Sequence, residues 1–503
     1  MKKAMKKLMA ALLAVAMVCA MAIPAFADGS SSTSTAAVTL YTITAPANGH
    51  TYEIYQIFTG DYDALQPSML TNIKWGTNGK GGTAGEAVEQ TVLDELSRVA
   101  SYTSDSDKLD VIEKYVTLTN PVKTITNGGS VEVVGGYYLI KDKDGTVPSS
   151  AAYTPYIVSV VGNVTIEPKS NEVPKFTKKL KDTNDTTGVI TGWQDSADYD
   201  IGDKIPFRLQ GTVSADYDSY SKYYYAFHDV EEKGLTFDSS SVEVFVGDEV
   251  TGTKIDASNY TVVTSPTDGC TFEIVFDDLK NISIVTAKSI ITVTYESTLN
   301  TDAVLGKDGN VNKAQLEYSN NPRGNGTGTT PWDNVIVFTY KVVVNKIDQS
   351  GQPLEGAEFT LTKKLKDGTE VDMPMNIDTS NKALFTLSGL DDGEYTLTET
   401  VTPAHYNTIS PITFTVNADH TITWESDSRD TVLTSLSGNT ASGEITFTPN
   451  KTDGTLTTDV INKIGTTLPG TGGIGTTIFY VIGGGLMVAA AILLITKKRM
   501  ENR

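Results

Sequence analysis

The C-terminal end of this 503-residue chain limits its possible folds more than any other feature. Residues 474–496 form an uncharged, apolar run, and Lys497, Lys498 and Arg499 follow it directly. An α-helix rises about 1.5 Å per residue, so about 20 apolar residues are enough to cross a bilayer. Basic residues beside a span stay in the cytoplasm. We therefore expect residues 474–496 to cross the membrane and the preceding chain to fold outside the cell.

The N-terminal end predicts export. Four lysines within the first seven residues precede an apolar stretch that ends near Ile23. Ala25-Phe26-Ala27 then forms a cleavage site typical of a signal peptide, so residues 1–27 are expected to be removed. Cys19 lies in this segment, which leaves Cys270 as the only mature cysteine and excludes an intramolecular disulfide.

The amino-acid composition limits the possible fold classes and the possible binding partners. The net charge of −21 argues against binding to nucleic acid, which is itself polyanionic. The length between the two end segments fits about three domains of roughly 150 residues each. Frequent Thr, Val and Tyr, together with Asn-Gly and Asp-Gly pairs, favour β-rich modules.

The pattern of apolar residues predicts a mainly β chain. Residues 28–170 should form an α+β domain, because apolar residues recur there with both helical and strand periods. Residues 171–340 and 341–467 should form tandem immunoglobulin-like β-sandwiches, and residues 468–503 form the C-terminal segment. In the first domain we expect strands at 51–58, 131–140 and 156–166, and helices at 86–100 and 109–116.

The two later domains should consist almost entirely of strands. In the second domain the expected strands are 205–213, 241–246, 271–276 and 289–295. In the third domain they are 341–345, 358–362, 395–399 and 459–462.

Three polar residues stand out among the strands of the third domain. Glu399 alternates with apolar residues on one strand, and Asn462 alternates with Val460 on another. An acid and an amide on apolar faces are costly to bury unless they are paired. Lys346, near the first strand, is the natural third member of the group.

The opening (Val344 to Phe359), middle (Gly393 to Glu399) and closing (Asp459 to Asn462) segments of this domain resemble the Cna B-type repeat. The resemblance implies an intramolecular isopeptide bond in which Lys346 is the nucleophile, Asn462 the electrophile and Glu399 the catalytic acid. The alternative interpretation is a buried salt bridge capped by an asparagine.

The second domain repeats this arrangement. Its segments Pro174 to Leu180, Phe227 to Phe237 and Leu316 to Pro322 resemble the central, Cna A-like domain of backbone pilins. The resemblance implies that Lys178 attacks Asn320, with Asp229 as the acid. Alternation along the strands favours Lys178 over Lys179 and Asn320 over Asn321.

Two further motifs resemble those of Gram-positive surface polymers. Leu468-Pro469-Gly470-Thr471-Gly472 resembles a sorting signal, in which a sortase cleaves after the threonine. Val164 to Lys169 resembles the pilin motif, although Glu167 replaces the usual tyrosine. The resemblance implies an amide bond from Thr471 of one subunit to Lys169 of the next.

Together these resemblances imply the major (backbone) subunit of a sortase-polymerised pilus anchored to the cell wall. The implied partners are identical subunits, pilus and housekeeping sortases, accessory pilins and peptidoglycan, with host surface ligands as a further class. The precursor would be held transiently in the plasma membrane. Self-cross-linking turns over once, so the chain is not expected to be an enzyme. Whether the first domain carries its own cross-link stays open.

Two alternatives remain: a monomeric wall-anchored adhesin, or an accessory pilin, that binds host matrix or carbohydrate. Lys169 distinguishes these alternatives from a backbone pilin, because only a polymer subunit needs this lysine for linkage to the next subunit. The four histidines show no metal-binding spacing, and no cofactor-binding motif occurs, so neither a metal nor a cofactor is expected. Cys270 is interpreted as a buried small residue in a β-strand setting rather than a nucleophile.

Overall fold

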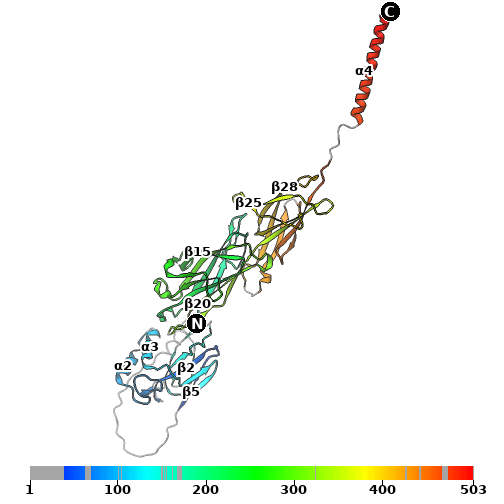
Figure 1. Ribbon diagram of the computed structural model, residues 1–503. Coiled ribbons are helices and arrows are strands. Elements are labelled where there is room, and N and C mark those ends of the chain that lie inside the picture. The colour runs from blue at the N-terminus through cyan, green and yellow to red at the C-terminus, as the bar shows by residue number, and fades with distance from the viewer. Residues whose placement is uncertain are drawn as a thin grey trace, which may run out of the picture.

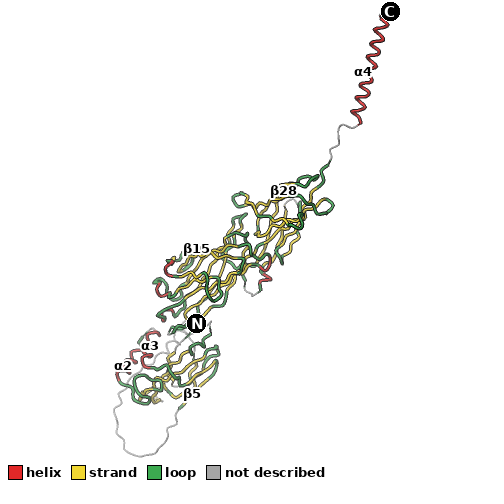
Figure 2. Tube along the Cα trace, viewed as in Figure 1, coloured by secondary structure: helices red, strands yellow, loops and turns green. Residues whose placement is uncertain are grey.

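The computed structural model describes residues 39–62, 70–99, 101–102, 105–148, 151, 153, 156–160, 162–166, 173–322, 324–424, 428–440, 443–466 and 474–501. The predicted signal peptide, Lys169 and the motif at 468–472 lie outside them. Three domains follow one another in a row, and a separate helix lies beyond the third (Figure 1). Figure 2 shows that strands dominate all three domains, which confirms the prediction of a mainly β chain.

The described part of the first domain contains two sheets and two α-helices. One sheet has the order β3-β2-β6-β7, with β4 paired to β2, and the other has the order β5-β1-β8. The bounds are β1 Leu40–Thr44, β2 Thr51–Tyr62, β3 Leu70–Trp75, α2 Gln90–Val99, α3 Asp105–Ile112, β4 Lys123–Thr126, β5 Ser130–Val134, β6 Gly136–Asp142, β7 Tyr156–Val160 and β8 Val164–Thr165, with a 3₁₀ turn at Glu113–Tyr115.

Three expectations for the first domain need correction. The predicted helix at 86–100 begins only at Gln90, because the residues before it bond to β3: the Val88 amide donates to the Ile73 carbonyl, and the Trp75 amide to the Glu86 carbonyl. The predicted strand at 131–140 is two strands, β5 and β6, which belong to different sheets. The predicted strand at 156–166 is likewise divided into β7 and β8, which belong to different sheets.

The second domain is a sandwich of two sheets. The larger has the order β12-β22-β20-β14-β18-β17, with β21 paired to β20, and the smaller has the order β16-β15-β19-β13-β9. The bounds are β9 Phe176–Leu180, β10 Thr183–Asn184, β11 Val189–Ile190, β12 Ser196–Asp198, β13 Lys204–Thr212, β14 Tyr225–Glu231, β15 Leu235–Val246, β16 Thr253–Lys254, β17 Thr261–Val263, β18 Phe272–Phe276, β19 Ile290–Leu299, β20 Asn310–Ser319, β21 Thr327–Thr329 and β22 Asp333–Phe338. Along β13 every second residue is buried, as expected for a strand with one face on the core.

The third domain is a second sandwich, with sheets β26-β27-β23-β32-β31 and β25-β24-β28-β29-β30. The bounds are β23 Tyr340–Asp348, β24 Glu358–Lys364, β25 Glu370–Met373, β26 Asn376–Ile377, β27 Leu384–Leu390, β28 Gly393–Val401, β29 Ile412–His420, β30 Leu433–Thr440, β31 Thr448–Asn450 and β32 Thr455–Asn462. Its first and last strands, β23 and β32, are neighbours and run parallel. The helix α4 (Ile474–Glu501) is long and apolar enough to span a membrane, as residues 474–496 led us to expect.

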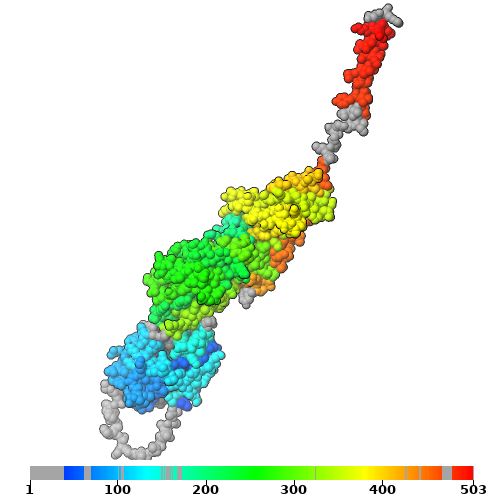
Figure 3. All heavy atoms as spheres, in the orientation of Figure 1, coloured from blue at the N-terminus to red at the C-terminus, as the bar shows by residue number. Residues whose placement is uncertain are grey.

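A buried ion cluster joins the second and third domains, which are in continuous contact in Figure 3. The ammonium of Lys363, on β24, contacts Asp391 of its own domain and two acids of the second domain, Asp200 at 2.5 Å and Asp185 at 3.1 Å. The Tyr395 hydroxyl donates to Asp391 at 3.2 Å. Lys363 is 1% exposed, so its charge is neutralised inside the interface rather than by water.

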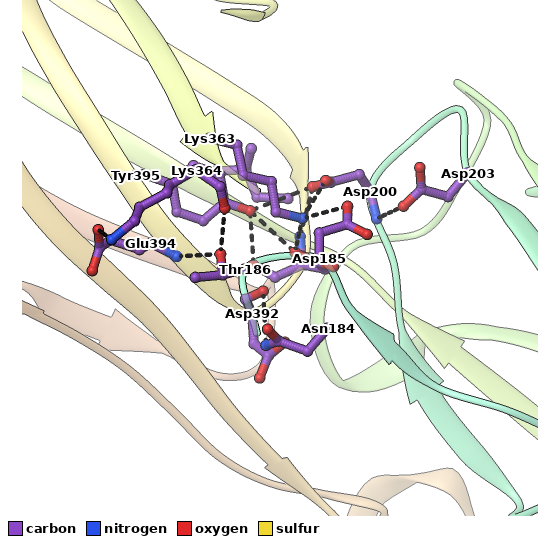
Figure 4. Close-up of polar contacts among 12 residues, drawn as sticks. Asn184, Asp185, Thr186, Asp200, Asp203, Lys363, Lys364, Asp392, Glu394 and Tyr395 are labelled. Carbon is purple, nitrogen blue, oxygen red and sulfur yellow. Dashed lines mark hydrogen bonds and ion pairs between the residues drawn. The ribbon is translucent and has the colours of Figure 1, made fainter. Parts of the chain in front are cut away.

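Further hydrogen bonds surround this cluster (Figure 4). Asn184 donates to the Asp392 carboxylate at 2.6 Å, and the Thr186 hydroxyl donates to the Lys364 carbonyl at 2.8 Å. The second and third domains therefore meet through specific polar contacts, and not only through the chain that connects them.

Replacing Lys363 with alanine should destabilise this interface strongly. It would leave Asp200 and Asp391 buried without a cation, which costs about 3–5 kcal/mol for a buried pair. Lys364→Ala is the matched control, because its partner Glu394 and its own side chain are partly exposed, and such pairs contribute about 0–1 kcal/mol. Denaturant unfolding of the two variants measures the difference; equal losses would contradict the assignment.

Candidate cross-linking sites

The third domain brings Lys346, Glu399 and Asn462 together in its core. Lys346 lies on β23 and Asn462 on the adjacent parallel strand β32, two residues beyond the position that pairs with Lys346. Glu399 lies on β28 of the opposite sheet. Lys346 and Asn462 are fully buried and Glu399 is 5% exposed. Strand alternation thus turns all three side chains into one sandwich interior.

The Asn462 amide points its nitrogen at the carboxylate of Glu399. Asn462 Nδ2 lies 2.8 Å from Glu399 Oε1 and 3.1 Å from Oε2, and it also donates to the Asn407 carbonyl at 3.1 Å. Asn462 Oδ1 is buried and has no hydrogen-bond partner among the described residues. The acid is therefore next to the atom that must leave if Asn462 is attacked.

The Lys346 amine has no carboxylate in direct hydrogen-bond contact within the described part of the chain. Its Nζ donates to the Val460 carbonyl at 3.0 Å. Burial lowers the pKa of Lys346 to about 8, against the opposing charge of Glu399. The neutral, nucleophilic fraction of this amine near neutral pH is therefore larger than that of an ordinary lysine.

In the second domain Lys178 and Asp229 meet inside the sandwich. Lys178 is on β9 of the smaller sheet and Asp229 on β14 of the larger, and both are fully buried. Lys178 Nζ lies 2.5 Å from Asp229 Oδ2. Burial lowers the pKa of Lys178 and raises the pKa of Asp229, against their mutual attraction, so both shifts favour the neutral amine and the neutral acid.

Tyr295 connects this pair to a residue that was not predicted, Asn312. The Tyr295 hydroxyl lies 2.8 Å from Lys178 Nζ and 2.9 Å from Asp229 Oδ2, and it accepts a bond of 3.0 Å from Asn312 Nδ2. Asn312 is on β20 and fully buried. Its Oδ1 lacks a hydrogen-bond partner among the described residues, like that of Asn462.

Glu231 is a second acid at this site. It lies opposite Asn312 across the β14–β20 ladder, and Asn312 Nδ2 donates to Glu231 Oε1 at 3.1 Å. Burial, with the nearby charge of Asp229, raises the pKa of Glu231 to about 7. The second domain therefore holds two carboxyl groups where the sequence predicted one.

The structure does not bring Asn320, the predicted electrophile, to Lys178. Asn320 follows the end of β20, where its side chain donates to the Ala151 carbonyl of the first domain at 3.4 Å. Asn320 and Asn321 both line a cavity of about 440 Å³ at the boundary between these domains. Eight positions of extended chain separate Asn320 from Asn312, about 26 Å.

This error has a simple physical cause. Strand alternation puts residues 312, 314, 316, 318 and 320 on one face, so it predicts the face but not the distance along the strand. The missing information is the register, in which Asp229 pairs with Ala314 and places Asn312 beside the acid. The available signal was Asn312, a buried asparagine two residues before the alanine that pairs with Asp229. Lys179, the rival of Lys178, forms an ion pair with Asp195 instead.

Comparisons with known proteins agree with this architecture. Residues 340–429 match the SpaA prealbumin-like fold domain, and residues 201–322 match the Cna-B-like domain of Gram-positive pilin backbone subunit 2. The second description differs from the Cna A-like type expected for that domain. The trypsin-resistant surface T6 protein of Streptococcus pyogenes serotype M6 is 26% identical over 399 residues, which are 65% of this chain and 69% of the relative.

The first of two solved structures shows a similar fold. The T6 backbone pilin of serotype M6 Streptococcus pyogenes has a TM-score of 0.50 and 18% identity, over 85% of this chain and 98% of that one. The full-length major pilin SpaD from Corynebacterium diphtheriae has a TM-score of 0.49 and 18% identity over the same shares. The chain is therefore similar to Gram-positive pilin backbone subunits in its second domain, and to the T6 protein over 399 residues.

Proposed function

We propose that the protein is the shaft subunit of a covalent, wall-anchored pilus, and that its second and third domains each form one Lys–Asn isopeptide bond. The observation that carries the proposal is a buried lysine, acid and asparagine gathered in the core of both domains. The pairs are Lys178 with Asn312 and Lys346 with Asn462. Such groups are costly to bury unless they react or pair with one another.

The reaction follows from the contacts. The neutral lysine amine attacks Cγ of the asparagine, a C–N bond forms, the bond from Cγ to Nδ2 breaks, and ammonia leaves. The carboxyl group accepts the proton from the amine and delivers one to the departing nitrogen. Glu399 already contacts Nδ2 of Asn462. In the second domain Asp229 contacts the amine and Glu231 contacts Nδ2 of Asn312, so two acids can divide these tasks.

The two bonds would carry tension in different ways. Lys178 and Asn312 lie on opposite sheets, so their bond crosses the sandwich and removes residues 179–311 from the load path. Lys346 and Asn462 lie on adjacent parallel strands of one sheet, so their bond prevents these strands from sliding apart. A pulled fibre would therefore be loaded through the bonds and short segments rather than through whole sheets.

Asn312→Ala should abolish the cross-link of the second domain, whereas Asn320→Ala should retain it. Tryptic digestion followed by tandem mass spectrometry tests this, because the bonded protein yields one branched peptide containing both Lys178 and the residue it links. Loss of the bond should also lower stability by about 4–5 kcal/mol, the cost of leaving so long a loop open in the unfolded chain. A branched peptide that persists in Asn312→Ala would contradict the choice of acceptor.

Polymerisation would use the two motifs outside the described residues. A pilus sortase would cleave after Thr471, and Lys169 of another subunit would attack the resulting acyl enzyme. A housekeeping sortase would then attach the fibre to peptidoglycan, and accessory pilins would join it by the same chemistry. The negative charge and α4 support a surface location with a transient membrane anchor.

Lys169→Ala should remove the high-mass ladder that cell-wall extracts give on denaturing gels. Lys175→Ala is the matched control, because Lys175 is an exposed lysine nearby and should leave the ladder unchanged. An intact ladder in Lys169→Ala would show that another lysine forms the link between subunits. Absence of any ladder from wild-type cells would favour the monomeric wall-anchored adhesin.

A further inference from the structure

A cluster of metal-binding side chains lies on the outer face of the second domain. His228 is on β14, directly opposite Glu273 on β18, and Asp268 and Cys270 come from the turn that precedes β18. One ligand atom from each of these four residues lies within 4.8 Å of the other three. His228 is 8% exposed, so the ring that anchors the cluster is held in place by packing.

The distances between these atoms suit a single small cation. His228 Nδ1 lies 3.0 Å from Asp268 Oδ2, 3.1 Å from Glu273 Oε1 and 3.9 Å from Cys270 Sγ, and Sγ lies 3.2 Å from Asp268 Oδ2. Zinc binds nitrogen, oxygen and sulfur at about 2.0–2.3 Å in a tetrahedron. The edges of such a tetrahedron are about 3.3–3.8 Å, close to the observed separations.

The opposite side of the imidazole supplies a second, independent observation. His228 Nε2 lies 3.0 Å from Oε2 of Glu317 on β20. A hydrogen on Nε2 donated to this carboxylate leaves the lone pair of Nδ1 pointing at Asp268, Glu273 and Cys270. Metal-binding histidines almost always donate their other nitrogen to a carboxylate, carbonyl or water in this way. Without a metal, a proton on Nδ1 would donate to these carboxylates, so a divalent cation would bind here by displacing that proton.

We propose that His228, Asp268, Cys270 and Glu273 bind one zinc-class divalent ion, with Glu317 orienting the histidine. The mixed nitrogen, sulfur and oxygen ligands select zinc over calcium or magnesium, which prefer oxygen alone. The ion would fasten the turn before β18 to β14, the strand that carries Asp229 at the next position. The sequence did not reveal this site because His228 lies 40 residues before Asp268 in the chain.

Two other groups of acidic residues are weaker candidates. Asp185, Asp200, Asp203 and Asp391 surround the Lys363 ammonium, which already supplies their cation. Asp182, Asp198 and His420 offer three ligand atoms and no sulfur. Only the His228 cluster, among the described residues, combines four ligand atoms with an oriented imidazole.

Metal titration of the full chain in detergent micelles, first stripped by a chelator, tests the proposal. We expect one equivalent of Zn²⁺ to bind, in competition with a chromophoric chelator. Cobalt in place of zinc should give a thiolate-to-metal charge-transfer band. Cys270→Ser should remove this band and weaken zinc binding by at least about tenfold.

Two further variants make the outcome decisive. Asp268→Asn changes an exposed ligand, so the fold should be retained while zinc affinity falls. Asp203→Asn in the other acidic group should bind zinc like the wild type. The proposal is overturned if the wild-type chain binds no stoichiometric zinc, or if Cys270→Ser and Asp268→Asn bind it as tightly as the wild type.

Discussion

The fold depends on what happens to a lysine amine in an apolar interior. A charged ammonium inside a β-sandwich loses its hydration, and the loss is large unless an anion compensates it. The three described lysines that are at most 1% exposed solve this problem in two ways. Lys363 stays charged among three aspartates and joins two domains. Lys178 and Lys346 lie beside an acid and an asparagine, where burial favours the neutral, nucleophilic amine.

The two candidate bonds share their chemistry but differ in topology. In the third domain the partners lie on neighbouring strands of one sheet, whereas in the second they face each other across the two sheets. The second domain also adds Tyr295 and Glu231 to the minimal set of residues. The ion cluster around Lys363 then extends this reinforcement across the boundary between the domains, and the single mature cysteine remains available for the metal site.

Sequence periodicity predicted the third domain's site better than the second's. Glu399 and Asn462 were found because each is a polar residue in an otherwise apolar alternation, and the short strand that ends at Asn462 left no rival position. In the second domain β20 and the residue that follows it put Asn312 and Asn320 on the same face, and alternation cannot choose between them. Only the pairing of β14 with β20 does so. The start of α2 was missed for a related reason. The residues before α2 form hydrogen bonds to β3, and the helix propensity of a local segment contains no information about such distant partners.

The intact mass of the folded and then denatured segment 28–471 tests the central claim most directly. Each isopeptide bond releases one ammonia, about 17 Da, so two bonds predict a mass about 34 Da below that of the unmodified chain. Asn312→Ala and Asn462→Ala should each halve the deficit after allowance for the substitution. A mass equal to that of the unmodified chain would contradict the account, because the buried lysines would then be stabilised by pairing alone.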